Sequence, residues 1–197
     1  MDHIGKQHYI PGLDGLRAIA MLSIIAYHFN FSWSRGGFLG VDVFFVLSGY
    51  LITSKILSLK EESDDFHLKK FWMGRIQRLL PSAYVMILIT VGWVILLHRE
   101  LIMKLWGDIG SSMIYLTNWW FIFHKLSYFD SFGTPSPFKH LWFLAVQEQF
   151  FIIWPIVLNI GLKYLKKSKK FLTIVFILVI CSAFLMGIMY NPEEDPS

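Results

Sequence analysis

The chain has 197 residues, of which 55% are hydrophobic and only 16% are charged. Soluble domains carry about 25% charged and about 45–50% apolar residues. The composition therefore excludes an ordinary soluble domain and indicates an integral membrane protein. The net charge of +4 comes from basic residues that cluster between apolar runs, as in cytoplasmic loops, so it is no sign of nucleic-acid binding.

Several apolar runs are long enough to cross a membrane, which takes about 20 mostly apolar residues. Four runs reach that length with few charges: 15–33, 37–57, 80–97 and 171–190. A fifth run, 140–162, is long enough but contains Gln147, Glu148 and Gln149, and a sixth, 108–124, is short and partly polar. These runs predict an all-α integral membrane protein, a polytopic helical bundle with five to six apolar segments.

Lysine and arginine positions predict the orientation of the spans. Basic residues concentrate in 55–78 and 163–170, so both segments are expected in the cytoplasm, whereas 32–36 and the C-terminal tail are expected outside and the N-terminus inside. Two cytoplasmic segments require an even number of spans between them, but three runs lie there. The weakest run, 108–124, is therefore predicted to be re-entrant or interfacial on the outer side. Five spans follow, with six as the alternative.

The stretch "LKKFWMGRIQRLLP" precedes the third span and is amphipathic. Basic side chains alternate there with aromatic and aliphatic ones, which is typical of a helix lying at the inner membrane interface. Pro81 suits the first turn of a separate helix that follows.

Arg17 and His28 share the first apolar run and are eleven residues apart. At 3.6 residues per turn this is almost three turns, so both lie on one helix face, about 16 Å apart along the axis. Ionisable groups in a span usually face a cavity or a partner. The alternative is that Arg17 reaches back to the inner surface along its aliphatic stem and His28 reaches the outer one.

Arg75 and Arg78 are three residues apart and therefore neighbours on a helix face. They either form a phosphate clamp at the inner membrane surface, for which the planar guanidinium is suited, or are ordinary cytoplasmic positive charge. Asp42 and Glu148 each lie within an apolar run and need a partner. Arg17 and His28 are candidates for Asp42, and either acid can also serve as a structural hydrogen-bonding group.

Motifs for other chemistries are absent from the sequence. There is no nucleophile elbow, no phosphate-binding loop, no dinucleotide fingerprint and no cysteine–histidine spacing for a metal. No metal or redox cofactor is expected.

Four segments in order carry a resemblance to a known family: "YIPGLDGLRAIAMLSIIAYHF", "GGFLGVDVFFVLSGYLIT", "RIQRLLP" and "HLWFLAVQEQFFIIWP". From about residue 9 onward, the chain resembles the membrane acyltransferase-3 family, most closely its Gram-positive peptidoglycan O-acetyltransferases. The family's Arg and His of the first helix correspond to Arg17 and His28, and its RxxR motif to Arg75 and Arg78. In the family's "WSL-x-VEEQF" motif, this chain keeps Glu148.

The resemblance implies an O-acyltransferase that moves an acyl group, usually acetyl, from cytoplasmic acyl-CoA to hydroxyls of a cell-surface glycan such as peptidoglycan. It implies that acyl-CoA phosphates bind Arg17, Arg75 and Arg78, and that His28 acts as general base or accepts the acyl group briefly. The other implied features are supporting roles for Asp42 and Glu148, a place in the cell membrane among its lipids, and no permanently bound cofactor.

Length departs from this family, whose membrane domain has about ten helices and, in the peptidoglycan enzymes, an added SGNH-type domain. The sequence therefore predicts a truncated acyltransferase-3 membrane domain over 1–197, whose partners include the missing C-terminal half. The alternatives are an inactive fragment and a non-enzymatic, transporter-like membrane module.

Overall fold

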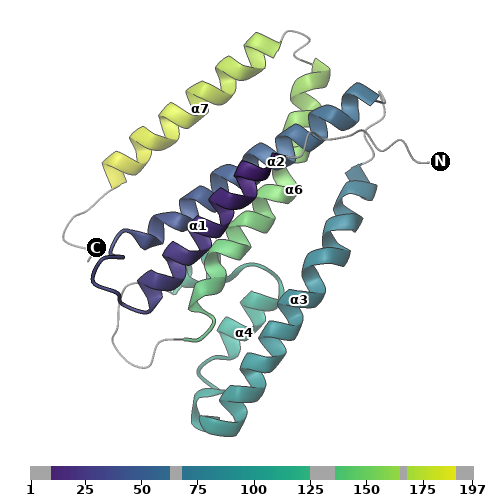
Figure 1. Ribbon diagram of the computed structural model, residues 1–197. Helices are drawn as coiled ribbons and strands as arrows, with labels where there is room; N and C mark the ends of the chain where they lie inside the picture. The colour runs from purple at the N-terminus through teal and green to yellow at the C-terminus, as the bar shows by residue number, and fades with distance from the viewer. Residues whose placement is uncertain (1–9, 63–67, 125–135, 165–167, 190–197) are drawn as a thin grey trace. The chain divides into compact units, whose positions relative to one another are not determined.

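The computed structural model describes residues 10–62, 68–124, 136–164 and 168–189 (Figure 1). Over these ranges the chain is helical and contains no strand. The α-helices are α1 (Pro11–His28), α2 (Gly40–Glu62), α3 (Leu68–Leu97), α4 (Trp106–Met113), α5 (Thr117–Phe123), α6 (Trp142–Tyr164) and α7 (Ser168–Met189). Short 3-10 helices are η1 (Gly37–Leu39), η2 (Arg99–Leu101) and η3 (Lys139–Leu141). The predicted all-α fold class is confirmed.

Within the described ranges, four helical segments are long and apolar enough to cross a membrane: Gly37–Lys60, Leu68–Leu97, Lys139–Tyr164 and Lys169–Met189. They correspond to four of the predicted spans. The helix α1, which carries Asp14, Arg17 and His28, is not among them. Which helices cross the bilayer, and in which direction, stays a prediction; the N-terminal segment and the C-terminal tail used for the orientation lie outside the described residues.

The partly polar run 108–124 is divided into two short helices. With eight residues in α4 and seven in α5, neither approaches the length of a span. Tyr115, whose φ is 55°, lies between the two helices. The amide of Leu116 donates to the Ser111 carbonyl and that of Tyr115 to the Ser112 carbonyl, as at a helix end closed by a left-handed residue. The predicted re-entrant or interfacial depth of this segment stays a prediction.

The chain divides into two compact units, residues 1–69 and 70–197, and each is described by itself. In the first, α1 packs against η1 and the start of α2 with very little space between backbones. A Cβ added at Gly40 would lie 2.5 Å from the Ala20 carbonyl oxygen, and one added at Gly37 would collide with the Ser23 carbonyl. These glycines therefore allow the backbones of α1 and α2 to approach closely.

The helix α1 ends five residues before the predicted end of the first apolar run. Asn30 adopts a left-handed conformation with φ of 56°. The amide of Phe31 donates to the carbonyl of Ala26 at 3.3 Å, and that of Asn30 to Tyr27 at 2.9 Å. This is the Schellman motif, whose left-handed residue is usually glycine and sometimes asparagine. The helix α1 therefore does not extend over the whole of the apolar run 15–33, and His28 is its last residue.

The predicted break at Pro81 is also wrong. The amphipathic stretch and the third span form one continuous helix, α3, of 30 residues, with Pro81 inside it. A proline inside a helix frees one carbonyl and removes one N–H, but apolar helices tolerate it when nearby groups compensate. The carbonyl that loses its donor to Pro81 is that of Gln77, four residues earlier. In the same part of the helix the Ser82 hydroxyl donates to the Leu79 carbonyl at 2.9 Å. Pro155 likewise lies within α6.

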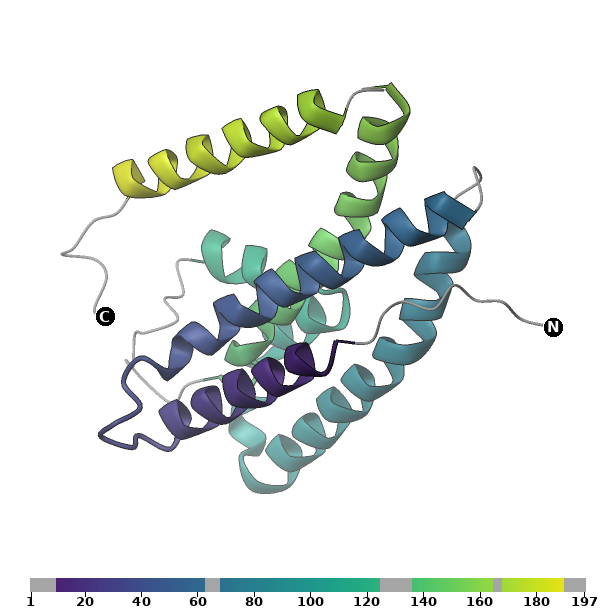
Figure 2. The same cartoon turned by 45° about the horizontal axis from the view of Figure 1, so that its top comes forward.

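The second unit has an apolar core at the C-terminal half of α3. Its buried members come from α3, the η2–α4 region and the segment before α6: Ile87, Val94, Leu105, Ile109 and Phe138. The helices α4 and α5 also contact each other, and α5 contacts α6. Figure 2 shows α7 running back from the end of α6, which it touches where the Phe171 ring covers Gly161.

Candidate functional site

Arg17 lies in the second turn of α1 and forms a local ion pair. Its Nη1 is 3.6 Å from Oδ1 of Asp14, three residues earlier, and the two side chains are 41% and 51% exposed. Exposed pairs of this kind contribute about 0–1 kcal/mol. The Nε of Arg17 is buried and has no hydrogen-bond partner among the described residues. Asp14 therefore balances part of the charge without occupying all five N–H donors.

His28 and Arg17 lie on one uninterrupted helix, as the spacing predicts. His28 is exposed, and its ring meets the Tyr27 ring edge-on with centroids 5.4 Å apart. Because α1 ends at His28, the imidazole stands at the C-terminus of this helix.

Asp42 is exposed in the first turn of α2. An acidic side chain in this position is stabilised by the partial positive charge of the helix N-terminus. Over the described residues no ion pair joins Asp42 to Arg17 or His28, and Arg17 is paired with Asp14 instead. The partner that the sequence suggested for Asp42 is therefore not found in this part of the chain.

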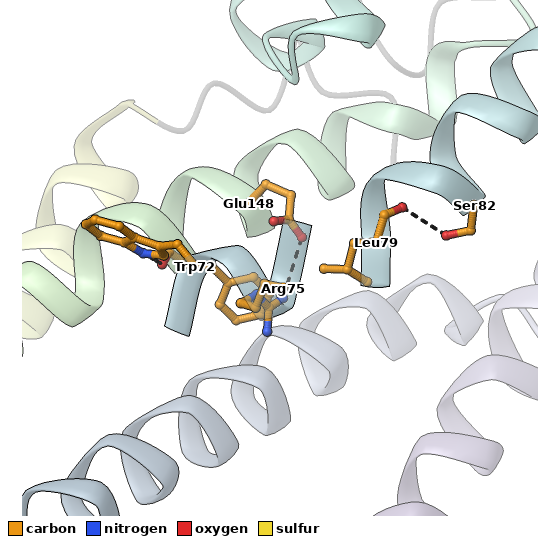
Figure 3. A network of polar contacts seen from close by, with 6 residues as sticks. Trp72, Arg75, Leu79, Ser82 and Glu148 are labelled. Carbon is orange, nitrogen blue, oxygen red and sulfur yellow. Dashed lines mark hydrogen bonds and ion pairs between the residues drawn. The ribbon is translucent and has the colours of Figure 1, made fainter. Parts of the chain in front are cut away.

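The structure brings Arg75 of α3 and Glu148 of α6 together (Figure 3). Nη2 of Arg75 lies 3.6 Å from Oε1 of Glu148, and the side chains are 28% and 18% exposed. The guanidinium carbon is 3.4 Å from the centre of the Phe151 ring, within range for a cation–π contact. The indole of Trp72 donates to the Phe151 carbonyl at 3.2 Å.

The contacts of Trp72 and Arg75 pair the start of α3 with the middle of α6, running in opposite directions. Trp72 contacts Phe151, and Arg75, about one turn later in α3, contacts Glu148, about one turn earlier in α6. This pairing places the charge about 10 Å from the start of α3 and about 24 Å from the end of α6. Along α6, Glu148 lies between Gln147 and Gln149, with the apolar stretches 142–146 and 150–158 on either side.

Hydrogen bonding in this pair is incomplete. Both Nε of Arg75 and Oε1 of Glu148 are buried without a hydrogen-bond partner in the described part of the chain. The separation of 3.6 Å exceeds the roughly 2.7–2.9 Å of a charge-assisted hydrogen bond. The two charges thus neutralise each other while several donor and acceptor positions stay unused.

Arg78 lies one helical turn after Arg75 and is exposed. The structure records no ion pair for it within the described residues, in contrast to Arg75. The two arginines of the RxxR motif therefore differ: one is held against α6, and the other presents its charge on the surface of α3.

Gln149 connects α6 to the turn between α4 and α5, a connection that the sequence did not predict. Its Nε2 donates to the Tyr115 carbonyl and to Oδ1 of Asn118, both at 2.9 Å. Its Oε1 accepts from Asn118 Nδ2 at 3.3 Å and from the Trp119 indole at 3.2 Å. The only sequence signal was that polar residues at 118 and 149 occur inside apolar runs.

Asp108 of α4 forms hydrogen bonds both within α4 and to α5. Its carboxylate accepts from the Trp120 indole at 2.8 Å, and its carbonyl accepts from the Ser112 hydroxyl at 2.6 Å. The Thr117 hydroxyl, which is fully buried, donates to the Ser112 hydroxyl at 3.2 Å. These bonds satisfy the polar groups of an otherwise apolar segment, as burial requires.

Tyr115 lies close enough to Glu148 for the carboxylate charge to act on its phenol. Burial raises the pKa of the Tyr115 phenol, and the charges of Glu148 and Tyr84 raise it further. The Tyr84 hydroxyl itself donates to the Met113 carbonyl at 3.1 Å. Two tyrosines, an ion pair and the Gln149 amide therefore belong to one polar region within the second unit.

Comparison with known proteins gives a family for the chain. The model of a family described as an acyltransferase domain matches residues 10–194. YrhL of Bacillus subtilis (strain 168) is 56% identical over 198 residues, which cover 100% of this chain and 31% of that protein. Peptidoglycan O-acetyltransferase OatA of Listeria monocytogenes serovar 1/2a is 53% identical over 192 residues, 98% of this chain and 31% of its own length.

A protein of Staphylococcus aureus (strain COL) is 45% identical over 98% of this chain and 32% of its own length. The chain thus spans about a third of the length of the curated relatives it matches. No solved structure matches it. Since one family model covers nearly every residue and relatives align along the same stretch, the chain belongs to the acyltransferase-3 family.

Proposed function

We propose that the chain is part of a membrane O-acyltransferase that moves an acyl group, acetyl in the simplest case, from acyl-CoA to hydroxyls of a cell-surface glycan. The observation that carries this proposal is its membership of the acyltransferase-3 family over residues 10–194. Peptidoglycan as the acceptor is suggested by the name of the Listeria monocytogenes relative, which is 53% identical.

Acyl-CoA is proposed to enter from the cytoplasm, with its phosphates bound by Arg17, Arg75 and Arg78. Arginine suits this role because its planar fork donates two parallel hydrogen bonds to phosphate oxygens. Support comes from the unused donors: Nε of Arg17 and of Arg75 have no hydrogen-bond partner in the described residues, and Arg78 is exposed. The acyl donor is a substrate, and no permanently bound cofactor is part of this proposal.

His28 is proposed as the general base. Its imidazole would take the proton of the acceptor hydroxyl while the hydroxyl oxygen attacks the thioester carbonyl, and the carbon–sulfur bond then breaks to release CoA. A variant of this route has His28 accept the acyl group first and pass it to the hydroxyl. Its exposure at the end of α1 gives a substrate access to the ring. Asp42 and Glu148 are proposed to support the site.

The location that fits this function is the cell membrane, with the N-terminus in the cytoplasm and membrane lipid around the helices. The basic residues of 55–78 and 163–170 support that orientation. The acceptor glycan would then meet the protein at the opposite surface.

A His28→Ala variant tests the function. Protein carrying this chain is produced in a Gram-positive host without its own glycan O-acetylation, and alkali-released acetate from purified cell wall is measured. We expect loss of acetylation by at least about a hundredfold, the scale of general base catalysis. His98→Ala is the matched control, because His98 is an exposed histidine that pairs with Glu100 after α3. Acetylation by His28→Ala equal to that of His98→Ala would refute the role of His28.

A further inference from the structure

The Arg75 side chain is positioned like the cation of an anion site. Its guanidinium lies on the Phe151 ring at 3.4 Å, and the Trp72 indole holds the carbonyl of the same residue. These contacts fix the plane in which the N–H donors point, so the fork is preorganised before any ligand arrives. Figure 3 shows the Glu148 carboxylate beside Arg75, with one dashed line for the ion pair between them.

Glu148 is a poor ligand for this preorganised fork. At 3.6 Å the carboxylate balances the charge of Arg75 but is too far away for a hydrogen bond. Nε of Arg75 and Oε1 of Glu148 are therefore buried without a hydrogen-bond partner among the described residues. Unsatisfied buried polar groups are destabilising, so native proteins usually keep them for a reason. A phosphate has three terminal oxygens, and it would satisfy Nε and Nη2 of Arg75 together.

We propose that Glu148 is an exchangeable counter-ion: it neutralises Arg75 while no donor is bound and is displaced by a phosphate of the acyl donor. This inference rests on the proposed function, because it assumes that acyl-CoA is the donor. Exposed Arg78, one turn further along α3, adds a second positive charge beside the exchange site. The exchange keeps the partly buried guanidinium of Arg75 paired with an anion in both states, so this positive charge is never left isolated.

The exchange has a measurable consequence for affinity. If only the fraction of molecules with a displaced Glu148 binds donor, the apparent dissociation constant is raised by the reciprocal of that fraction. Removing the carboxylate charge removes this competition. The Glu148→Gln variant keeps the size of the side chain, removes its charge and replaces one acceptor oxygen by an NH2 donor that cannot pair with the guanidinium. We therefore expect it to bind CoA about tenfold more tightly than the wild-type chain.

The test uses the purified chain in nanodiscs of zwitterionic lipid, with CoA as the probe and calorimetry as the readout. Glu100→Gln is the matched control, since it removes the same charge from an exposed position beside His98. Glu148→Asp is a second variant, which keeps the charge but draws it back by one methylene; an intermediate gain in affinity is expected. Thermal unfolding of each variant checks that the fold is retained.

The outcomes separate the inference from the function on which it rests. Tighter CoA binding by Glu148→Gln, with Glu100→Gln unchanged, supports the exchange. Wild-type binding that depends on Arg78 but is equal or weaker in Glu148→Gln overturns the exchange and leaves the donor assignment standing. Absence of CoA binding by both the wild type and Glu148→Gln refutes the donor assignment itself, and the exchange with it.

Phosphate at Arg75 could also come from a lipid headgroup, and a second arm distinguishes the two sources. The same measurements are repeated in nanodiscs that contain anionic phosphatidylglycerol. If Glu148→Gln still binds CoA more tightly than the wild type does, the exchanging phosphate belongs to the donor. If the gain disappears in anionic lipid, lipid phosphate occupies Arg75, and the assignment to the donor is overturned.

Discussion

The side-chain amides of Gln149 and Asn118 form two hydrogen bonds with each other. Nε2 of Gln149 donates to Oδ1 of Asn118 at 2.9 Å, and Oε1 of Gln149 accepts from Nδ2 of Asn118 at 3.3 Å. An amide that donates and accepts at once cannot be replaced by a carboxylate, because a carboxylate only accepts. The same amide also donates to the Tyr115 carbonyl, so the turn between α4 and α5 is fixed to α6 through one side chain.

A Gln149→Glu substitution should therefore destabilise the protein although it hardly changes the volume of the side chain. Two donated bonds are lost and two oxygens are brought face to face, so we expect a loss of about 1–3 kcal/mol, measured as a lower midpoint of unfolding in detergent. Gln77→Glu is the control, since Gln77 is exposed on α3. Equal midpoints for the two variants would contradict the role of the amide network.

Gly40 should be intolerant of any side chain. An added Cβ would lie 2.5 Å from the Ala20 carbonyl oxygen and 2.8 Å from the Ser23 hydroxyl, so α1 and α2 would have to separate. We expect Gly40→Ala to cost about 1–3 kcal/mol, as overpacking does. Gly36→Ala is the control, because a Cβ added at Gly36 would have no neighbouring atom within 4 Å. Disulfide cross-linking of cysteines placed in α1 and α2 measures the separation, and unchanged cross-linking in Gly40→Ala would speak against it.

Hydropathy and length predicted most of the fold. Runs of about 20 apolar residues correspond to the four long helices, because helix formation is the only way for such a run to satisfy its backbone. The ends of helices were harder to predict. The end of α1 depends on the left-handed conformation of Asn30, and hydropathy does not report backbone conformation.

The candidate site was predictable in part. An acid in the apolar run of α6 indicated that Glu148 needs a partner, but its partner, Arg75, lies on a helix far away in sequence, and spacing along one helix cannot reveal it. The polar residues of 108–124 marked this run as the weakest candidate span, but their pairing with Gln149 depends on how α5 packs on α6. Local patterns thus identified which residues need partners, and tertiary packing decided which partners they have.

Asn30 should accept glycine and reject a β-branched residue. Its φ of 56° is open to glycine and asparagine, whereas a branched side chain is strained there. We expect Asn30→Gly to stay within about 0.5 kcal/mol of the wild type and Asn30→Val to lose about 1–2 kcal/mol. The readout is the unfolding midpoint of both variants. A stable Asn30→Val protein would mean that α1 does not end in this turn.

Arg75 and Glu148 should be energetically coupled. Removing either one alone leaves a half-buried charge without its partner, so Arg75→Ala is expected to cost about 1–3 kcal/mol, less than for a fully buried pair. The double variant Arg75→Ala/Glu148→Ala should be less damaged than the sum of the single variants by about 1–2 kcal/mol. The unfolding midpoints of the wild type, the two single variants and the double variant form a double-mutant cycle. Strictly additive losses of stability would show that the two charges act independently.

Tyr115 should make stability depend on pH in the alkaline range. Burial, aided by the charges of Glu148 and Tyr84, raises the pKa of its phenol above the ordinary value of 10.0. The unfolded chain then loses this proton first as pH rises, so the contribution of Tyr115 is complete below about pH 10 and is lost as pH rises through the folded-state pKa. We expect the unfolding midpoint of the wild type to fall more steeply between about pH 9 and pH 11 than that of Tyr115→Phe. Tyr50→Phe, at an exposed position of α2, should follow the wild type; parallel curves for all three proteins would contradict the prediction.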